Sequence, residues 1–385
     1  MNLNTYTRLS GFYFFYFSLL GALVPYWSLY LKSFGFNAET IGILMSILMA
    51  SRIIAPNIWG WVADRTGQRV AIVRLGSLAT CIIFIAIFWQ ESAWGIALVM
   101  AGFSFFWNAV LPQFEVITLT HLGSRTELYS RVRLWGSIGF IITVVGIGWL
   151  LDLIEVRWLP HLMLGLMICI WLSSLFVSGE AVERDQNESG FKQQLLRPQV
   201  LAFFAICFLI QFSHGPYYTF YSVLMDSLGY SRVEIGLLWA IGVIAEVIIF
   251  IYMHRIIGRL GLRFVMIISL VLCVLRWLLI GFTPDNLPLM LFAQSLHAVT
   301  FGSLHAVGIA LVHHYFTPGC HGQGQAMFSS FGFGFGGAAG ALVSGLAWDT
   351  LGAGATFYTA AGAVFVAVLL ATIWIKPENC AQTNR

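Results

Sequence analysis

Several ionisable side chains of this sequence lie inside long apolar runs, where charges are rare. The clearest are Arg52, Glu246, Arg276 and His297, and Glu115 lies near the end of another such run. A charge at the centre of a lipid bilayer costs about 2.5–3.5 kcal/mol on insertion scales, so such residues mark binding sites or proton pathways by default. The chain has no Cys and His spacing typical of a metal site, no HExxH motif and no nucleophile elbow. These residue types therefore indicate ion and proton binding within a membrane, without metal or covalent catalysis.

The composition explains how charged residues come to be buried in this way. Of the 385 residues, 59% are apolar and only 10% are charged, with 20 Lys and Arg against 17 Asp and Glu. A soluble chain with so few charges could not cover its surface, which excludes a cytosolic enzyme and a disordered chain. The net charge of +3 is too small and too dispersed for nucleic-acid binding. A lipid bilayer, which accepts apolar side chains, is the expected partner.

The apolar runs predict an all-α membrane protein with twelve transmembrane helices in two pseudo-symmetric six-helix bundles. The backbone of a membrane span must satisfy its own hydrogen bonds, so each run forms a helix of about 20 residues. The longest polar stretch, 179–198, predicts a cytoplasmic linker between an N-terminal bundle at 1–178 and a C-terminal bundle at 199–385. The expected spans are about 9–31, 41–63, 70–90, 94–120, 132–151, 158–178, 199–222, 234–254, 263–283, 287–312, 322–348 and 352–375.

Most of the 20 Lys and Arg residues fall on one side of the predicted membrane. Cytoplasmic loops carry such an excess, so we expect both termini in the cytoplasm. The first apolar run is too long for the core of a signal peptide, and we expect it to be retained as a helix. The prediction is a multi-pass protein of the bacterial cytoplasmic (inner) membrane.

The two halves of the sequence repeat each other. Segment 31–44 (LKSFGFNAETIGIL) aligns with 225–238 (MDSLGYSRVEIGLL), and in the same register 65–69 (RTGQR) aligns with 259–263 (RLGLR). A duplicated six-helix unit explains both matches. Parallel repeats in transporters place the substrate near the bilayer midplane between the halves. In this register Arg52 coincides with Glu246, so we expect the two to face each other across a central cavity. The alternative is that neighbours neutralise each one separately.

The loop between the second and third predicted spans carries a recognisable motif. Its sequence at 60–69, GWVADRTGQR, resembles the signature G-x-x-x-D-R-x-G-R-R/K of the major facilitator superfamily, with Gln68 in place of one basic residue. The resemblance implies that the loop steadies the conformation closed on the cytoplasmic side. Its glycines would permit close helix packing and a turn, and its acid would pair with a basic neighbour or cap a helix. The implied gating residues are Gly60, Asp64, Arg65, Gly67 and Arg69.

Two further segments look like the fourth and fifth helices of the lactose-permease-like branch of that superfamily. They are PQFE at 112–115 and RVRLWG at 131–136. The resemblance implies that Glu115 and Arg133 bind substrate, and that Glu246, Arg276 and His297 handle the coupled proton. The chain departs from the branch three residues to either side of that histidine, where a lysine and an acid are replaced by Gln294 and Thr300.

A third resemblance covers most of the chain. It includes the segments PYWSLYLK at 25–32, ETIG at 39–42, VRLWGS at 132–137, VIAEVIIF at 243–250 and RW at 276–277, which look like those of the 3-phenylpropionate (hydrocinnamate) permeases. The resemblance implies proton-coupled transport of a small aromatic carboxylate such as 3-phenylpropionate.

Residue chemistry indicates how such a substrate would be bound. The fork of an arginine matches a carboxylate, so Arg133 or Arg52 is expected to hold the anion, while a gate pair between Arg133 and Glu115 is the alternative. Glu246 is expected to carry the proton, with Arg276 and His297 as its partners. A stripe of polar and aromatic side chains would contact the ring. The expected substrate-binding residues are Arg133, Glu115, Arg52, Asn108, Tyr218, Gln211 and Trp135.

We therefore predict a monomeric secondary active transporter that is driven by the proton gradient and needs no cofactor or metal. A proton-coupled sugar or nucleoside symporter is the alternative, because a sugar site uses similar aromatic and polar residues. A polytopic membrane enzyme or a membrane sensor is less favoured, since the chain has neither a catalytic motif nor a sizeable soluble segment.

Overall fold

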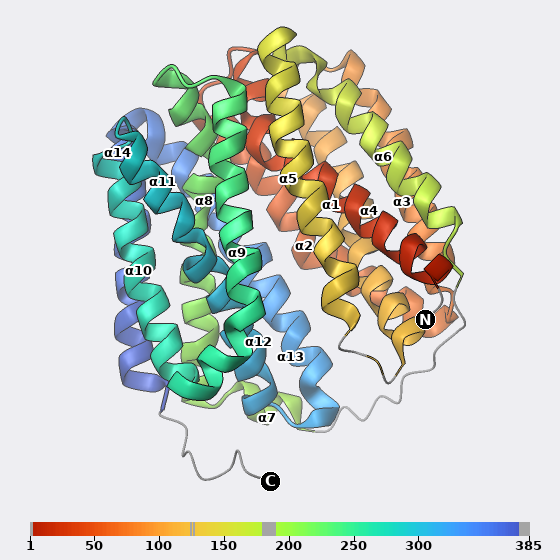
Figure 1. The fold of residues 1–385 in the computed structure, drawn as a ribbon, viewed down its shortest axis with the longest axis vertical. Helices are drawn as coiled ribbons and strands as arrows, with labels where there is room; N and C mark the ends of the chain where they lie inside the picture. The colour runs from red at the N-terminus through yellow and green to blue at the C-terminus, as the bar shows by residue number, and fades with distance from the viewer. Residues whose placement is uncertain (1–2, 124, 126–127, 179–189, 377–385) are drawn as a thin grey trace. The chain divides into compact units, whose positions relative to one another are not determined.

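The computed structural model describes residues 3–123, 125, 128–178 and 190–376, and its regular elements there are all helical. Figure 1 shows the helices coloured in chain order. The first six long helices are α1 Leu3–Lys32, α2 Ala38–Thr66, α3 Arg69–Ile85, α4 Ala93–Leu122, α5 Tyr129–Leu153 and α6 Leu159–Leu175. After the short α7 Phe191–Leu195 come α8 Pro198–Ser227, α9 Arg232–Leu260, α10 Leu262–Phe282, α11 Leu287–Ser295, α12 Leu304–Tyr315, α13 His321–Met327 and α14 Gly337–Trp374.

The predicted spans agree closely with these helices. Within the described residues, eleven helical stretches are long and apolar enough to cross a membrane. The last covers 57 residues, Pro318–Trp374, and Gly352 interrupts it with φ 87° and ψ 163°. Because glycine adopts such angles far more readily than other residues, the stretch divides there into two crossings. The prediction of an all-α protein with twelve membrane helices is confirmed.

The internal repeat is visible in the backbone. Gly35 and Gly229, at equivalent positions of the repeat, have φ of 79° and 87° in the turns after α1 and α8. Gly67 and Gly261 are likewise equivalent, with φ of 67° and 77° between α2 and α3 and between α9 and α10. Residues with a side chain rarely adopt this region, so each duplicated turn contains the residue type that suits it.

The chain forms two compact units. The first unit contains residues 1–185, 218–240 and 341–346, and the second contains 186–217, 241–340 and 347–385. In the first unit, α1 approaches α5 so closely that a Cβ on Gly21 would lie 2.8 Å from the carbonyl oxygen of Phe140. At the end of α5, Asp152 accepts hydrogen bonds from the backbone N–H groups of Arg232 and Val233, at 2.7 and 3.0 Å, and so caps the start of α9.

The predicted linker lies partly outside the described residues, which resume at 190. Its described end forms α7, which is attached to the turn before α13. The amide of Gln194 accepts from the backbone N–H of Thr317 at 2.8 Å and donates to its Oγ1 at 3.2 Å. Phe191 stacks on Phe316, with ring centroids 5.2 Å apart. The division into bundles at 1–178 and 199–385 stays a prediction.

Two π-helical segments distinguish the second unit. The segment η4, Ala298–Ser303, joins α11 to α12, and η6, Phe328–Gly336, joins α13 to α14. Such wide turns are rare and frequently occur at functional sites. The residues around these two segments are therefore candidates for the functional site.

Candidate functional site

A network in the second unit joins the three residues predicted to handle the proton. Arg276 on α10 has its Nη1 atom 3.0 Å from Nδ1 of His297 and 3.1 Å from Oγ1 of Thr300. The other ring nitrogen of His297, Nε2, lies 3.4 Å from Oε2 of Glu246 on α9. His297 therefore bridges a guanidinium and a carboxylate. We call these three residues the Arg–His–Glu triad.

Small residues on the neighbouring segments allow the triad to form. A Cβ on Gly242 of α9 would lie 3.2 Å from Cβ of His297. A Cβ on Gly302 of η4 would lie 3.0 Å from Cγ of Glu246. Because these are tight contacts in a close-packed interior, a side chain at either position would require His297 or Glu246 to shift.

The hydrogen bonds of the triad determine where His297 carries its hydrogen. Arginine has N–H donors and no acceptor. Nδ1 of His297 must therefore accept from Arg276, so the neutral ring carries its hydrogen on Nε2, the atom that faces Glu246. In this arrangement the imidazole is uncharged and the guanidinium is positive.

Aromatic rings enclose the guanidinium of Arg276, whose side chain is completely buried. Its central carbon lies 4.3 Å from the ring centroid of Tyr217 and 4.6 Å from that of Trp277. Such cation–π contacts offset part of the loss of water around the charge. The hydroxyl of Tyr217 in turn donates to Oε1 of Gln294 at 2.8 Å. Sequence reasoning did not select Tyr217, because only the rotation of α8 decides which residue faces α10; the neighbouring Tyr218, selected for contact with the substrate ring, lies beside Arg52.

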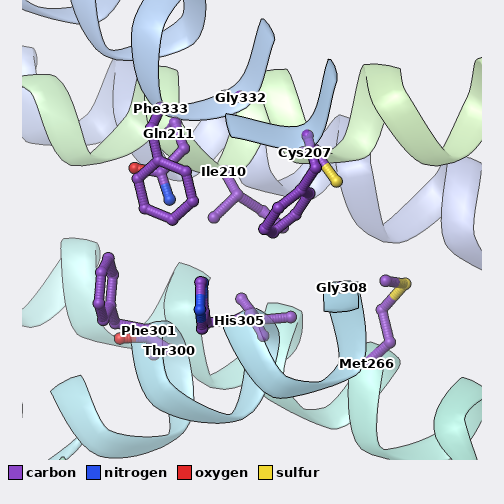
Figure 2. A pocket seen from close by; sticks show the side chains of 12 residues that line it. Cys207, Ile210, Gln211, Met266, Thr300, Phe301, His305, Gly308, Gly332 and Phe333 are labelled. Carbon is purple, nitrogen blue, oxygen red and sulfur yellow. The ribbon is translucent and has the colours of Figure 1, made fainter. Parts of the chain in front are cut away.

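A pocket in the second unit lies next to the triad. Thr300, which accepts a hydrogen bond from Arg276, is one of its lining residues. Figure 2 shows Gln211 and Phe333 on one side of it and Phe301 and His305 on the other. The rings of His297, Phe301 and His305 form a continuous stack, with 5.2 and 6.4 Å between successive centroids. The lining residues are Cys207, Ile210, Gln211, Met266, Thr300, Phe301, Leu304, His305, Gly308, Phe328, Gly332 and Phe333. Both π-helical segments contribute to the wall, so the wide turns and the pocket coincide.

In the first unit, Arg133 and Glu115 are electrostatic neighbours, but they do not form the ion pair that was the alternative prediction. Among the described residues, the guanidinium of Arg133 contacts rings instead, 3.7 Å from the centroid of Phe17 and 5.8 Å from that of Tyr13. Glu115 accepts a hydrogen bond from the hydroxyl of Tyr129 at 3.2 Å. The rings of Tyr13 and Tyr129 meet edge to face, at 6.5 Å between centroids. The alternative of a direct gate pair is therefore not seen, because aromatic side chains link the two charges, and the expected role of Arg133 in substrate binding stays a prediction.

The other predicted residues of the first unit fall into two groups. Arg52 has Tyr16 and Tyr218 as its electrostatic neighbours. Asn108 on α4 donates to Oγ of Ser51 at 2.7 Å, which places its amide beside α2 close to Arg52. These residues therefore share one region of the first unit. The expectation that Arg52 faces Glu246 stays a prediction.

Trp135 lies apart from them. Its side chain is 39% exposed, and its Nε1 atom donates to the hydroxyl of Tyr6 at 2.8 Å, near the beginning of α1. The structure therefore gives it a surface contact and does not bring it to the other predicted substrate residues.

The motif loop has the expected turn and ion pair. Gly67 adopts a left-handed conformation with φ 67°, and its N–H closes the end of α2 on the carbonyl of Ala63 at 2.9 Å. Arg69 donates to Asp64 and to the side chain of Gln113 on α4, a residue that sequence reasoning did not select.

Two other motif residues contribute in different ways. The guanidinium of Arg65 lies 5.3 Å from the ring centroid of Trp61. Gly60 is not needed for close packing, because a Cβ there would meet Gln113 at an ordinary 3.9 Å.

The fold and the triad together define a class of protein. Membrane-crossing helices arranged as a duplicated unit, with a buried Arg–His–Glu triad beside an aromatic pocket, are typical of a secondary membrane transporter. Among the described residues, no cluster of three or more His, Cys, Asp and Glu side chains could hold a metal ion.

Comparison with known proteins agrees with this class. The chain belongs to the MFS_1-like family, whose profile matches residues 6–359. It is 31% identical over 306 residues to a probable 3-phenylpropionic acid transporter of Escherichia coli (strain K12), covering 78% of this chain and 80% of the relative. It is 25% identical over 338 residues to the transporter YwbF of Bacillus subtilis (strain 168), covering 86% of this chain and 84% of the relative.

A solved structure shares the fold. A mutant form of the nucleoside transporter NupG superimposes with a TM-score of 0.86 at 20% identity, covering 97% of this chain and 100% of that one. The protein is thus a multi-pass membrane transporter of the major facilitator type that acts on a small molecule.

Proposed function

We propose that the protein moves a small aromatic carboxylate together with a proton across the bacterial cytoplasmic membrane. The Arg–His–Glu triad carries the proposal, because it places a carboxylate inside a membrane helix and links it through a neutral imidazole to a buried cation. The similarity to a probable 3-phenylpropionic acid transporter supports the substrate class.

The triad supports proton coupling because its two protonation states differ by one charge in a medium that penalises charge. An ionised Glu246 is stabilised by the N–H of His297 and by the nearby guanidinium. A protonated Glu246 leaves the positive charge of Arg276 uncompensated within the triad. Proton binding therefore changes the balance of forces inside the second unit, which is the requirement for coupling a proton to a conformational change.

Aromatic surroundings of the charged residues support a ring-bearing substrate. Arg133 lies against Phe17, and Arg276 lies between Tyr217 and Trp277. Aromatic faces bind flat rings by stacking as well as binding cations. Within the proposal, the motif loop acts as a gate and both termini lie in the cytoplasm, as the placement of Lys and Arg predicts.

Transport into proteoliposomes tests the proposal. Labelled 3-phenylpropionate should accumulate when the interior is alkaline, and Glu246→Gln should abolish this accumulation while exchange of internal for external substrate continues. Glu39→Gln, at an exposed position in the first turn of α2, is the matched control and should behave as wild type.

Competition identifies the substrate class. Uptake of a neutral sugar or nucleoside with no response to aromatic acids would replace the substrate assignment. If uptake of the aromatic acid does not depend on an imposed pH gradient, proton coupling is refuted.

A further inference from the structure

Three buried hydrogen-bond donors beside the triad have no acceptor in good hydrogen-bonding geometry among the described residues. They are Nε and Nη2 of Arg276 and Nε2 of Gln294. Both side chains are completely buried, and Tyr217 connects them, since its ring covers the guanidinium and its hydroxyl donates to the amide oxygen of Gln294. A buried donor left without an acceptor is destabilising, and three together require an explanation.

We propose that these donors form the site for the substrate's carboxylate, and that this site is filled when Glu246 holds a proton. The inference rests on the proposed function and deepens it. It assigns the anion to the second unit, in place of Arg133 or Arg52.

The geometry of the guanidinium favours a carboxylate. Its Nη1 atom is already engaged by His297 and Thr300. The remaining edge, Nε with Nη2, presents two parallel N–H groups, the arrangement that matches the two oxygens of a carboxylate. A neutral acceptor such as a sugar hydroxyl would satisfy one donor and leave the positive charge uncompensated.

The charges around Glu246 make proton and anion binding depend on each other. Arg276 on α10 is positive, and His297, between α11 and η4, is neutral because its Nδ1 atom accepts from that guanidinium. On α8, Tyr217 is a neutral phenol, and His214 donates through Nδ1 to the carbonyl of Ile210 at 2.8 Å. With Glu246 ionised the group is neutral overall, and with Glu246 protonated it carries one positive charge. A bound carboxylate restores neutrality, so each ligand favours the other.

The stoichiometry follows from this balance. One proton on Glu246 and one monocarboxylate on Arg276 leave the second unit with the charge it had when empty. A proton from the medium on one side binds the carboxylate of Glu246 and is released to the medium on the other side. No other covalent bond is formed or broken. Transport is therefore electroneutral.

The adjoining pocket suits the remainder of an aromatic acid. It begins at Thr300, which accepts from Nη1 of Arg276, and its walls are mostly apolar and aromatic (Figure 2). A carboxylate on the unpaired edge of the guanidinium would thus lie next to Thr300, which lines this apolar pocket.

The first experiment separates the two driving forces in proteoliposomes containing the full-length protein. A pH gradient of one unit at zero membrane potential should sustain about tenfold accumulation of 3-phenylpropionate. A potassium gradient of about a hundredfold with valinomycin, at equal pH on both sides, should sustain none. Accumulation driven by the potassium gradient, or its opposite, exclusion of the anion, would show that net charge moves and would overturn the inference.

The second experiment measures binding to purified protein in detergent. Affinity for 3-phenylpropionate should fall as pH rises in the wild type, with one proton taken up per anion bound, and Glu246→Gln should bind with an affinity independent of pH. Arg276→Lys keeps the charge but loses the fork, and should weaken binding by about 10–100-fold. Arg197→Lys, at an exposed position of the same unit, is the control.

The outcomes separate this site from the function. A wild type that transports 3-phenylpropionate while Arg276→Lys binds it unchanged refutes the carboxylate site and leaves the proposed function standing. Loss of binding in Glu246→Gln, in protein that remains folded by circular dichroism, refutes the dependence on the proton. A wild type that binds only neutral solutes refutes both proposals.

Discussion

Replacement of His297 by glutamine tests whether this histidine carries the proton or only positions its neighbours. The imidazole accepts from Arg276 over 3.0 Å through Nδ1 and faces Glu246 over 3.4 Å through Nε2. The oxygen and nitrogen of a glutamine amide are bonded to one carbon, just as Nδ1 and Nε2 of histidine are bonded to one ring carbon. The amide oxygen can replace Nδ1 as the acceptor, and the amide nitrogen can replace Nε2 as the donor. The amide can therefore make both contacts, but it cannot titrate.

If His297 stays neutral, the glutamine variant should retain uptake driven by a pH gradient within about threefold of wild type, because the bridge is kept. The leucine variant has similar bulk but no polar atom. It leaves Nη1 of Arg276 with Thr300 alone and removes the donor to Glu246, so stability should fall by about 1–3 kcal/mol. Its uptake should fall by about 10–100-fold, because each 1.4 kcal/mol corresponds to about a factor of ten.

The assay is initial uptake of labelled substrate against external pH, with thermal unfolding of the same preparations as the stability measure. The reasoning is refuted if the glutamine variant is stable yet uptake no longer responds to the pH gradient while exchange persists. That combination would mean that the imidazole itself takes up the proton.

Three further predictions concern residues outside the triad. Gly67→Ala should destabilise the protein by about 1–2 kcal/mol in thermal unfolding, because φ of 67° is strained for alanine, whereas Gly362→Ala, whose Cβ would meet open space, should not. Trp135→Phe should leave the Michaelis constant for uptake unchanged, since it loses only one hydrogen bond to Tyr6, and a rise of about tenfold or more would return it to the substrate site. Arg69→Gln should lower the maximal uptake rate with little change in substrate affinity, because the contacts of the guanidinium are to Asp64 and Gln113, and a change in affinity alone would contradict a gating role.

The helices and the repeat could be predicted from the sequence because both depend on local patterns. A run of about 20 apolar residues must form a helix in lipid whatever its neighbours do. Turn glycines are equally local, and the duplicated pairs Gly35 with Gly229 and Gly67 with Gly261 adopt the positive φ that their residue type permits. The sequence also predicted two separate spans at 322–348 and 352–375, and the backbone of Gly352 divides the continuous helical stretch Pro318–Trp374 at that boundary.

The contacts of the candidate site required the tertiary structure. The sequence indicated Glu246, Arg276 and His297 as a group, but it could not show that His297 bridges the other two. Nor could it show that Tyr217, rather than Tyr218, covers the guanidinium. Which side chains meet across helices depends on the rotation and spacing of elements that lie far apart in the chain, and small residues such as Gly242 and Gly302 set that spacing. Hydropathy predicts which residues lie inside the membrane, whereas the packing of helices against one another determines which side chains they contact.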